Sequence, residues 1–151
     1  MIIDAQDQKR LRDILKGVEF FKRLKIGQIE DLIKNLEKVT FKKGSDIIKE
    51  GTEGNTFYII SKGRVSAWQK KGLLKKTFLS ELGPNEFFGE MALLSTGERT
   101  ATVVAEDDCV LFKLYRNDFK KIMKSNPDME KAVYEALERR RNRSERKKNE
   151  N

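Results

Sequence analysis

Residues Phe88–Val104, F-G-E-M-A-L-L-S-T-G-E-R-T-A-T-V-V, are the stretch around which the rest of the chain is organised. Gly89 has no Cβ and allows a close approach of backbone to a ligand. A short helical turn that starts near Glu90 leaves its first N–H groups without partners, and such groups suit an anion. Arg99 supplies a fork of donors that fits a phosphate through two parallel hydrogen bonds. The stretch therefore predicts an anion cradle.

The acidic residue in this stretch narrows the ligand. A carboxylate at Glu90 would repel a phosphate held by Arg99, unless Glu90 accepts hydrogen bonds from a sugar hydroxyl of the same ligand. The residues alone thus indicate a phosphorylated sugar or a nucleotide. The alternative is a surface ion pair between Glu90 and Arg99, which is the commoner arrangement for two such residues taken by themselves.

Outward from this stretch, the hydrophobic period changes along the chain. Helical periodicity after a cap at Asp4 and again at 28–36 gives way to short β-branched and aromatic runs separated by glycine-bearing turns. These runs lie at 39–41, 46–49, 56–61, 64–69, 73–79, 86–88, 99–105 and 109–115. Eight such strands predict a sandwich or barrel. Helix returns at 118–124 with Asn117 as its cap, and restarts at Asn126-Pro127.

Two further blocks accompany the first. Phe41–Val65 carries glycines at 44, 51, 54 and 63, which we interpret as turn residues without a ligand role, and Leu82–Glu90 reads L-G-P-N-E-F-F-G-E. Together the three blocks resemble the cyclic nucleotide-binding domain family, which includes protein kinase regulatory subunits, cyclic-nucleotide-gated channels and the bacterial catabolite activator protein. The resemblance covers residues 15–140, and 88–104 corresponds to the family's phosphate-binding cassette.

The resemblance implies a mainly β fold with flanking helices: an eight-stranded jelly-roll β-roll with N-terminal helices and a C-terminal lid helix. We divide the chain into an N-terminal helical segment at 1–36, a β-roll at 37–116 that contains the cassette at 88–104, hinge and lid helices at 117–140, and a basic tail at 141–151. The lid helix carries a short apolar stripe of Met129, Val133, Ala136 and Leu137. Because the stripe is short, we expect this helix to be weakly held without ligand.

The resemblance also implies a function, a non-enzymatic sensor that binds cAMP or cGMP. Arg99 would hold the cyclic phosphate, supported by N–H groups of Ala92 and Ala101, and Glu90 with the Gly89 backbone would hold the ribose 2′-hydroxyl. Pocket walls and lid complete the expected ligand-binding set, which is Phe88, Gly89, Glu90, Met91, Ala92, Arg99, Thr100, Ala101, Val65, Val103, Leu137 and Arg140. Ligand would favour closure of the lid helix over the base and so shift the population toward the closed state.

Thr100 bears on the choice of base. The cyclic-GMP-dependent kinases have threonine at this place, where its hydroxyl can bond a guanine held syn, and the cyclic-AMP-dependent ones have alanine. Channels with the same Arg-Thr-Ala order can nevertheless prefer cAMP, which the wider part of the family accepts. Thr100 favours cGMP without deciding between the two ligands, and the wider family's acceptance of cAMP favours cAMP as the ligand.

Composition excludes several classes of protein. The chain has 151 residues, 38% of them apolar and 37% charged, which suits one domain with one core. No apolar run approaches the roughly 20 residues of a membrane span, and the first residues do not resemble a signal peptide. The single cysteine, Cys109, lies in an apolar run and is interpreted as a buried thiol. These features predict a cytoplasmic location.

The absence of histidine excludes Ser-His-Asp and Cys-His catalysis, and with one cysteine it argues against a zinc site. We therefore expect no catalytic residue and no metal. The net charge of +8 is concentrated between 139 and 151, where seven Lys and Arg face two Glu, so it is a weak argument for nucleic acid as a partner. The expected partners are a cyclic nucleotide and an effector protein such as a kinase or a channel.

Two alternatives to a free-standing sensor remain. One is the sensor part of a catabolite-activator-like transcription regulator, in which a helix-turn-helix would follow the long helix, although these residues leave no room for it. The other is a regulatory fragment of a cyclic-nucleotide-dependent kinase or channel, with the kinase motifs or membrane spans elsewhere.

Overall fold

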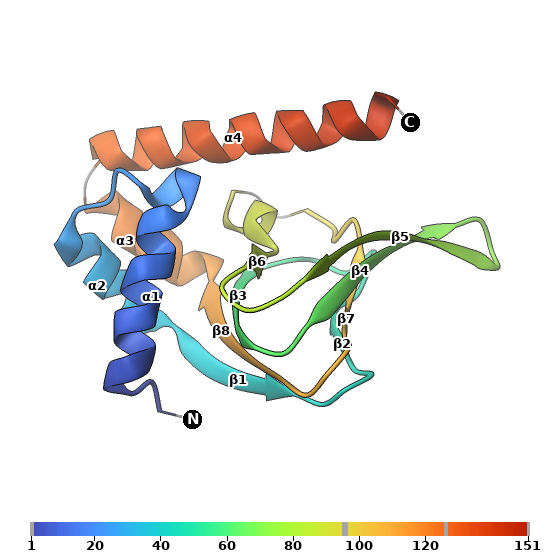
Figure 1. Cartoon of the computed structure of the whole chain (residues 1–151). Helices are drawn as coiled ribbons and strands as arrows, with labels where there is room; N and C mark the ends of the chain where they lie inside the picture. The colour runs from blue at the N-terminus through green and yellow to red at the C-terminus, as the bar shows by residue number, and fades with distance from the viewer. Residues whose placement is uncertain (1, 95–96, 126, 151) are drawn as a thin grey trace.

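Two four-stranded antiparallel sheets form the centre of the chain (Figure 1). The structure, a computed structural model, describes residues 2–94, 97–125 and 127–150, and the side chains of 129 and 144–150 also lie outside the described set. One sheet has the order β1-β8-β3-β6 and the other β2-β7-β4-β5. The strands are β1 (Glu37–Phe41), β2 (Asp46–Ile48), β3 (Thr56–Lys62), β4 (Val65–Lys71), β5 (Lys75–Leu82), β6 (Phe87–Phe88), β7 (Thr102–Ala105) and β8 (Cys109–Tyr115).

The sheet that contains β3 and β8 is buried on both faces. Successive side chains of a strand point to opposite faces, so Phe57 and Ile59 of β3 join one apolar cluster while Tyr58 and Ile60 join the other. The second cluster lies between the two sheets and contains Ile48, Tyr58, Ile60, Val65, Phe88, Val103, Ala105, Cys109 and Leu111. Burial on both faces explains why β3 is a continuous apolar run and does not alternate.

Helices cover the other face of this sheet. They are α1 (Ala5–Gly17), the 3-10 turn η1 (Glu19–Phe21), α2 (Ile26–Asn35), the 3-10 turn η2 (Glu90–Leu93), α3 (Arg116–Lys124) and α4 (Pro127–Glu150). Figure 1 shows α1, α2 and α3 gathered at one end of the β-roll, with α4 lying across them as one long helix. Contacts of α4 with η1, α3 and η2 bring it against both the helical layer and the cassette. None of the described helices is both long and apolar enough to cross a bilayer.

The fold class predicted from the sequence is confirmed, with three local differences. The strand expected at 73–79 is β5 at 75–82, because Leu73 and Leu74 lie in the hairpin turn. The strand expected from Arg99 begins at Thr102, since 97–99 instead pairs with the loop at 51–54. The prediction that Asn117 caps the helix after β8 is wrong.

That helix, α3, begins at Arg116 directly after the strand, and no side chain caps it. The amide of Arg116 donates to Asn55 O at 2.9 Å, so a loop from before β3 satisfies a donor that a cap would otherwise take. The cap expected at Asn126 lies outside the described residues.

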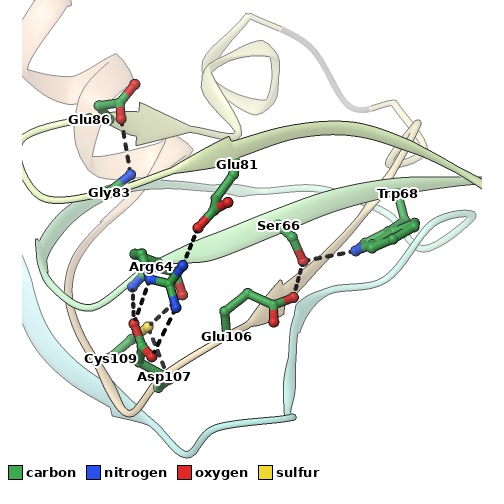
Figure 2. A network of polar contacts seen from close by, with 9 residues as sticks. All are labelled: Arg64, Ser66, Trp68, Glu81, Gly83, Glu86, Glu106, Asp107 and Cys109. Carbon is green, nitrogen blue, oxygen red and sulfur yellow. Dashed lines mark hydrogen bonds and ion pairs between the residues drawn. The ribbon is translucent and has the colours of Figure 1, made fainter.

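A polar network joins neighbouring strands of the second sheet near their ends (Figure 2). Arg64 Nη1 contacts Glu81 Oε1 at 2.6 Å and Arg64 Nε contacts Asp107 Oδ2 at 3.1 Å, which joins the start of β4 to β5 and to the β7–β8 turn. The hydrogen bond from Arg64 lowers the pKa of Asp107. Beside this network Cys109 is buried, as predicted, and burial raises the pKa of its thiol.

Candidate functional site

The second residue of the cassette is a glycine that cannot be replaced without strain. Gly89 has φ of 79° and precedes η2, and β6 before it pairs with β3 through Tyr58 and Phe88. A Cβ at Gly89 would lie 3.0 Å from Thr56 O and 3.1 Å from Arg99 Nη1. Both the left-handed backbone and the close approach therefore require glycine here.

Arg99 is held by two loops, 51–54 and 97–99, that pair through backbone hydrogen bonds. The amide of Arg99 donates to Thr52 O at 2.7 Å, and its carbonyl accepts from the amide of Gly51 at 2.8 Å. The guanidinium Nη2 donates to Thr56 O at 2.7 Å and to Thr56 Oγ1 at 2.9 Å. These bonds fix the direction of the side chain through the strand β3, 43 residues earlier in the sequence.

Gly54 makes room for this side chain. A Cβ at Gly54 would lie 2.6 Å from Arg99 Nε, and its amide donates to Gly97 O at 3.0 Å. Gly54 thus does more than form a turn, and Thr56 joins it as a residue of the site that the sequence did not single out. No local sequence pattern identifies Gly54 or Thr56 as a site residue, because each comes into contact with Arg99 only after the two loops have paired.

The charged side chain of Arg99 is half-buried. Burial lowers the pKa of Arg99 and nearby Arg116 lowers it further, while Tyr58 and Glu90 oppose the shift. A half-buried, oriented cation of this kind binds an oxyanion more strongly than a fully solvated one does.

A cavity of about 230 Å³ opens beside Arg99. It is lined by Asp46, Ile47, Ile48, Lys49, Thr52, Glu53, Asn55, Thr56 and Arg99. Arg99 is the one member of the predicted ligand-binding set among these lining residues. The β2 end of the cavity was not predicted, because its residues have no motif of their own.

Glu90 contacts α4. Arg140 Nε lies 2.5 Å from Glu90 Oε1, with the two side chains 39% and 15% exposed, and Arg140 Cζ lies 5.0 Å from the centroid of the Phe87 ring. Among the described residues, the ion-pair partner of Glu90 is therefore Arg140 of α4 and not Arg99. The pair links the cassette to α4 across 50 residues of sequence.

The remaining predicted residues fall into two groups. Val65, Phe88 and Val103 are buried in the cluster between the sheets, and the amide of Ala92 donates to Gly89 O at 3.2 Å. Met91 and Ala101 are half-buried, and Thr100 is exposed with its carbonyl accepting from Gln69 Nε2 at 2.9 Å.

Leu137 lies elsewhere, fully buried in the helical core together with Val133 and Ala136. These three residues attach α4 more firmly than its short apolar stripe indicates; the side chain of Met129 lies outside the described residues. The structure thus brings together Gly89, Glu90, Arg99 and Arg140, and buries Leu137 in the helical core one turn before Arg140.

Comparisons with known proteins agree on this region. The family model described as "Cyclic nucleotide-binding domain" matches residues 38–126. The cAMP-dependent protein kinase regulatory subunit of Eremothecium gossypii is 34% identical over 134 residues, which are 84% of this chain and 28% of that protein. The cGMP-dependent protein kinase 2 of Homo sapiens is 32% identical over 131 residues, 85% of this chain and 17% of that protein.

Among solved structures, the regulatory domain of Toxoplasma gondii PKA with cAMP aligns with a TM-score of 0.74 and 27% identity. The alignment covers 79% of this chain and 45% of that one. The chain spans less than a third of the length of either curated relative.

Proposed function

Because the chain belongs to the cyclic nucleotide-binding domain family, we propose that it is a regulatory sensor that binds cAMP or cGMP at the 88–104 cassette and relays occupancy through α4. The observation that carries the proposal is the position of Arg99, which two paired loops hold half-buried while Gly54 and Gly89 make room for it. An oriented guanidinium suits the single negative charge of a cyclic phosphate.

In this proposal each group of residues around Arg99 binds a different part of the ligand. Arg99 binds the phosphate, Glu90 with the Gly89 backbone binds the ribose 2′-hydroxyl, and Met91, Val65 and Val103 form the apolar surroundings. A carboxylate can accept several hydrogen bonds, so Glu90 can hold a ribose hydroxyl while it stays paired with Arg140. Phosphate and ribose are then both bound within the 88–104 cassette.

The relay follows from that shared carboxylate. A ribose hydroxyl on Glu90 restricts its rotamers to those that also reach Arg140, so ligand and α4 favour the same arrangement of one side chain. Residues 37–116 would bind the ligand, and 117–140 would carry the response to an effector protein. That effector is another chain or another part of a longer protein, in a cytoplasmic setting, and no catalytic step is assigned to this domain.

The sugar contact gives a specific expectation. Glu90→Gln should weaken binding of cAMP and cGMP more than binding of their 2′-deoxy forms, because a neutral amide accepts a hydrogen bond from the 2′-hydroxyl less strongly than a carboxylate does. Calorimetric titration of the parent chain and of Glu90→Gln with all four ligands measures the difference. Equal losses for the ribose and deoxyribose forms would remove Glu90 from the ribose site.

A substitution at Thr100 tests which base the domain prefers. If its hydroxyl bonds guanine, Thr100→Ala should weaken cGMP selectively by about 1 kcal/mol, the value of one neutral hydrogen bond. The exposed position of Thr100 makes a folding defect unexpected, and Thr77→Ala is a matched control on an exposed strand. The ratio of cGMP to cAMP affinity is the readout, and an unchanged ratio would leave Thr100 without that role.

The proposal itself is tested by calorimetric titration of the chain with cAMP and cGMP side by side, with 5′-AMP as the comparison ligand. We expect saturable one-to-one binding of at least one cyclic nucleotide and much weaker binding of 5′-AMP, whose second phosphate charge and open geometry do not match one guanidinium and an adjacent carboxylate. Absence of heat with both cyclic nucleotides, in a chain that unfolds cooperatively on heating, would contradict the proposed ligand class.

A further inference from the structure

The β4–β5 hairpin extends past the sheet to which it belongs. Strand β7 pairs with β4 only as far as Trp68 and Thr102, whereas β4 and β5 remain paired with each other out to Lys71 and Lys75. Residues 69–77 therefore form a two-stranded arm that β7 does not support, and Figure 1 shows it projecting away from the body of the molecule. An arm of this kind gains little stability from its own two strands.

The tip of the arm exposes two leucines. Leu73 is 102% exposed and Leu74 is 98% exposed, more than any other large apolar residue that the structure describes. Exposed apolar side chains at the end of a projecting loop contribute nothing to the core, so their presence is unexplained by folding.

Four lysines surround these leucines. Lys70 lies opposite Lys76, and Lys71 lies opposite Lys75, so like charges face each other across the ladder and weaken the hairpin. The sequence from Gln69 to Ser80 contains no acid. Among the residues that the structure describes, the carboxylate bonded to the arm is that of Glu50, which accepts from the backbone amide of Lys70 at 3.1 Å. Four clustered lysines that weaken the hairpin would instead favour binding to a negatively charged partner.

An aromatic pair marks the base of the arm. Trp68 and Phe78 lie opposite each other with ring centroids 5.3 Å apart, and Lys76 Nζ lies 5.4 Å from the Trp68 centroid. Phe78 and Leu79 are also about half exposed. The apolar tip, the four lysines and the aromatic pair thus follow one another along the hairpin. Leucines at the tip with lysines directly behind them match the change from hydrocarbon to charged headgroups at a bilayer surface.

We propose that this hairpin tip docks the domain on an anionic phospholipid bilayer, with Leu73 and Leu74 entering the acyl boundary and the four lysines contacting lipid phosphates. Lysine is depleted from protein–protein interfaces, where its charge must be desolvated, but it serves well at a bilayer surface because the head stays wet. A nucleic acid would match the lysines but gives two leucines nothing apolar to enter. The inference does not depend on the nucleotide site.

The test is sedimentation of the chain with vesicles of phosphatidylcholine alone or mixed with phosphatidylserine. Binding is expected only to the mixed vesicles and should fall as salt is raised. Leu73→Ala with Leu74→Ala should weaken it at least tenfold, and Lys71→Gln with Lys75→Gln by roughly 25-fold, since each lysine near an anionic surface contributes roughly fivefold.

Matched controls have the same chemistry at other exposed places. Ile2→Ala with Ile26→Ala removes exposed apolar side chains, and Lys42→Gln with Lys43→Gln removes two exposed charges. Neither pair should change vesicle binding. If the leucine variant binds vesicles as well as the parent does, adsorption comes from the basic tail and the inference is overturned. Failure of the parent to bind either kind of vesicle would also overturn it. So would a leucine variant that alone loses self-association, because the tip would then contact a second copy of the chain and not a bilayer.

Insertion depth has its own readout, because the chain has one tryptophan. In a chain with Trp68→Phe and Leu73→Trp, the single indole lies at the tip, where brominated acyl chains should quench its fluorescence. Unquenched emission from vesicle-bound protein would contradict insertion of the tip.

Discussion

The Arg99→Ala variant is expected to bind cyclic nucleotide more weakly than the parent chain by about 2–4 kcal/mol. The guanidinium is already oriented by Thr56 and by the pairing of the two loops, so it loses little entropy when a phosphate arrives. Arg99→Lys should also lose affinity, because an ammonium cannot replace two parallel donors. Calorimetric titration with cAMP and cGMP measures both variants.

A matched control separates local loss from general loss of charge. Arg23→Ala removes one exposed arginine outside the cassette and should leave affinity unchanged. The Arg99 variants should keep the β-rich circular dichroism of the parent, since the loop pairing uses backbone groups of residue 99. An Arg99→Ala variant that is folded and binds as tightly as the parent would refute the assigned phosphate site.

The Leu137→Ala variant is expected to lower the free energy of unfolding by about 2–5 kcal/mol, the range for large-to-small changes in a packed core. Leu137 is 0% exposed and belongs to the cluster that joins α4 to the helices over the first sheet. Urea unfolding followed by circular dichroism measures the loss. Leu79→Ala, at a side chain that is 45% exposed, should stay within about 0.5 kcal/mol of the parent.

This result decides how α4 is held. If Leu137→Ala unfolds at the parent's urea concentration, the burial of α4 against the helical layer is not maintained in solution and the helix is the loosely attached lid that its short stripe suggests. A large loss would mean instead that Leu137 holds α4 against the helical layer in solution.

Periodicity and glycine-bearing turns were sufficient to predict eight strands and the helices at both ends. Local propensity gave the wrong helix start where the hydrogen-bond partner is distant in the sequence. Asn117 is a good capping residue, yet α3 starts one residue before it because Asn55 O accepts the amide of Arg116 from another part of the fold.

The candidate site shows the same limit. Glu90, Gly89 and Arg99 share one motif, so a single sequence reveals them together. Gly54 and Thr56 hold Arg99 only after residues 51–54 have paired with 97–99, and no local pattern announces that pairing. Leu137 was assigned to the ligand from its helical face, but a helix with neighbours on two sides buries some of that face in the protein.

Hydrogen exchange with and without saturating cyclic nucleotide tests the relay from cassette to α4 most directly. Arg140→Ala removes the link to Glu90, and Arg141→Ala is its matched control, because Arg141 pairs within α4 with Glu138 at 3.9 Å. Both variants should still bind nucleotide through Arg99 and protect the cassette, but Arg140→Ala should bind more weakly than Arg141→Ala, because its pair with Glu90 no longer favours the bound arrangement.

In the parent chain and in Arg141→Ala, ligand should slow amide exchange across 127–140 more than in the strands at 39–61, which sheet hydrogen bonds already protect. In Arg140→Ala, protection should appear at 88–104 while 127–140 exchanges as fast as without ligand. If ligand protects 88–104 of the parent chain but leaves 127–140 unchanged, the domain binds nucleotide without a relay through α4, and the account is contradicted.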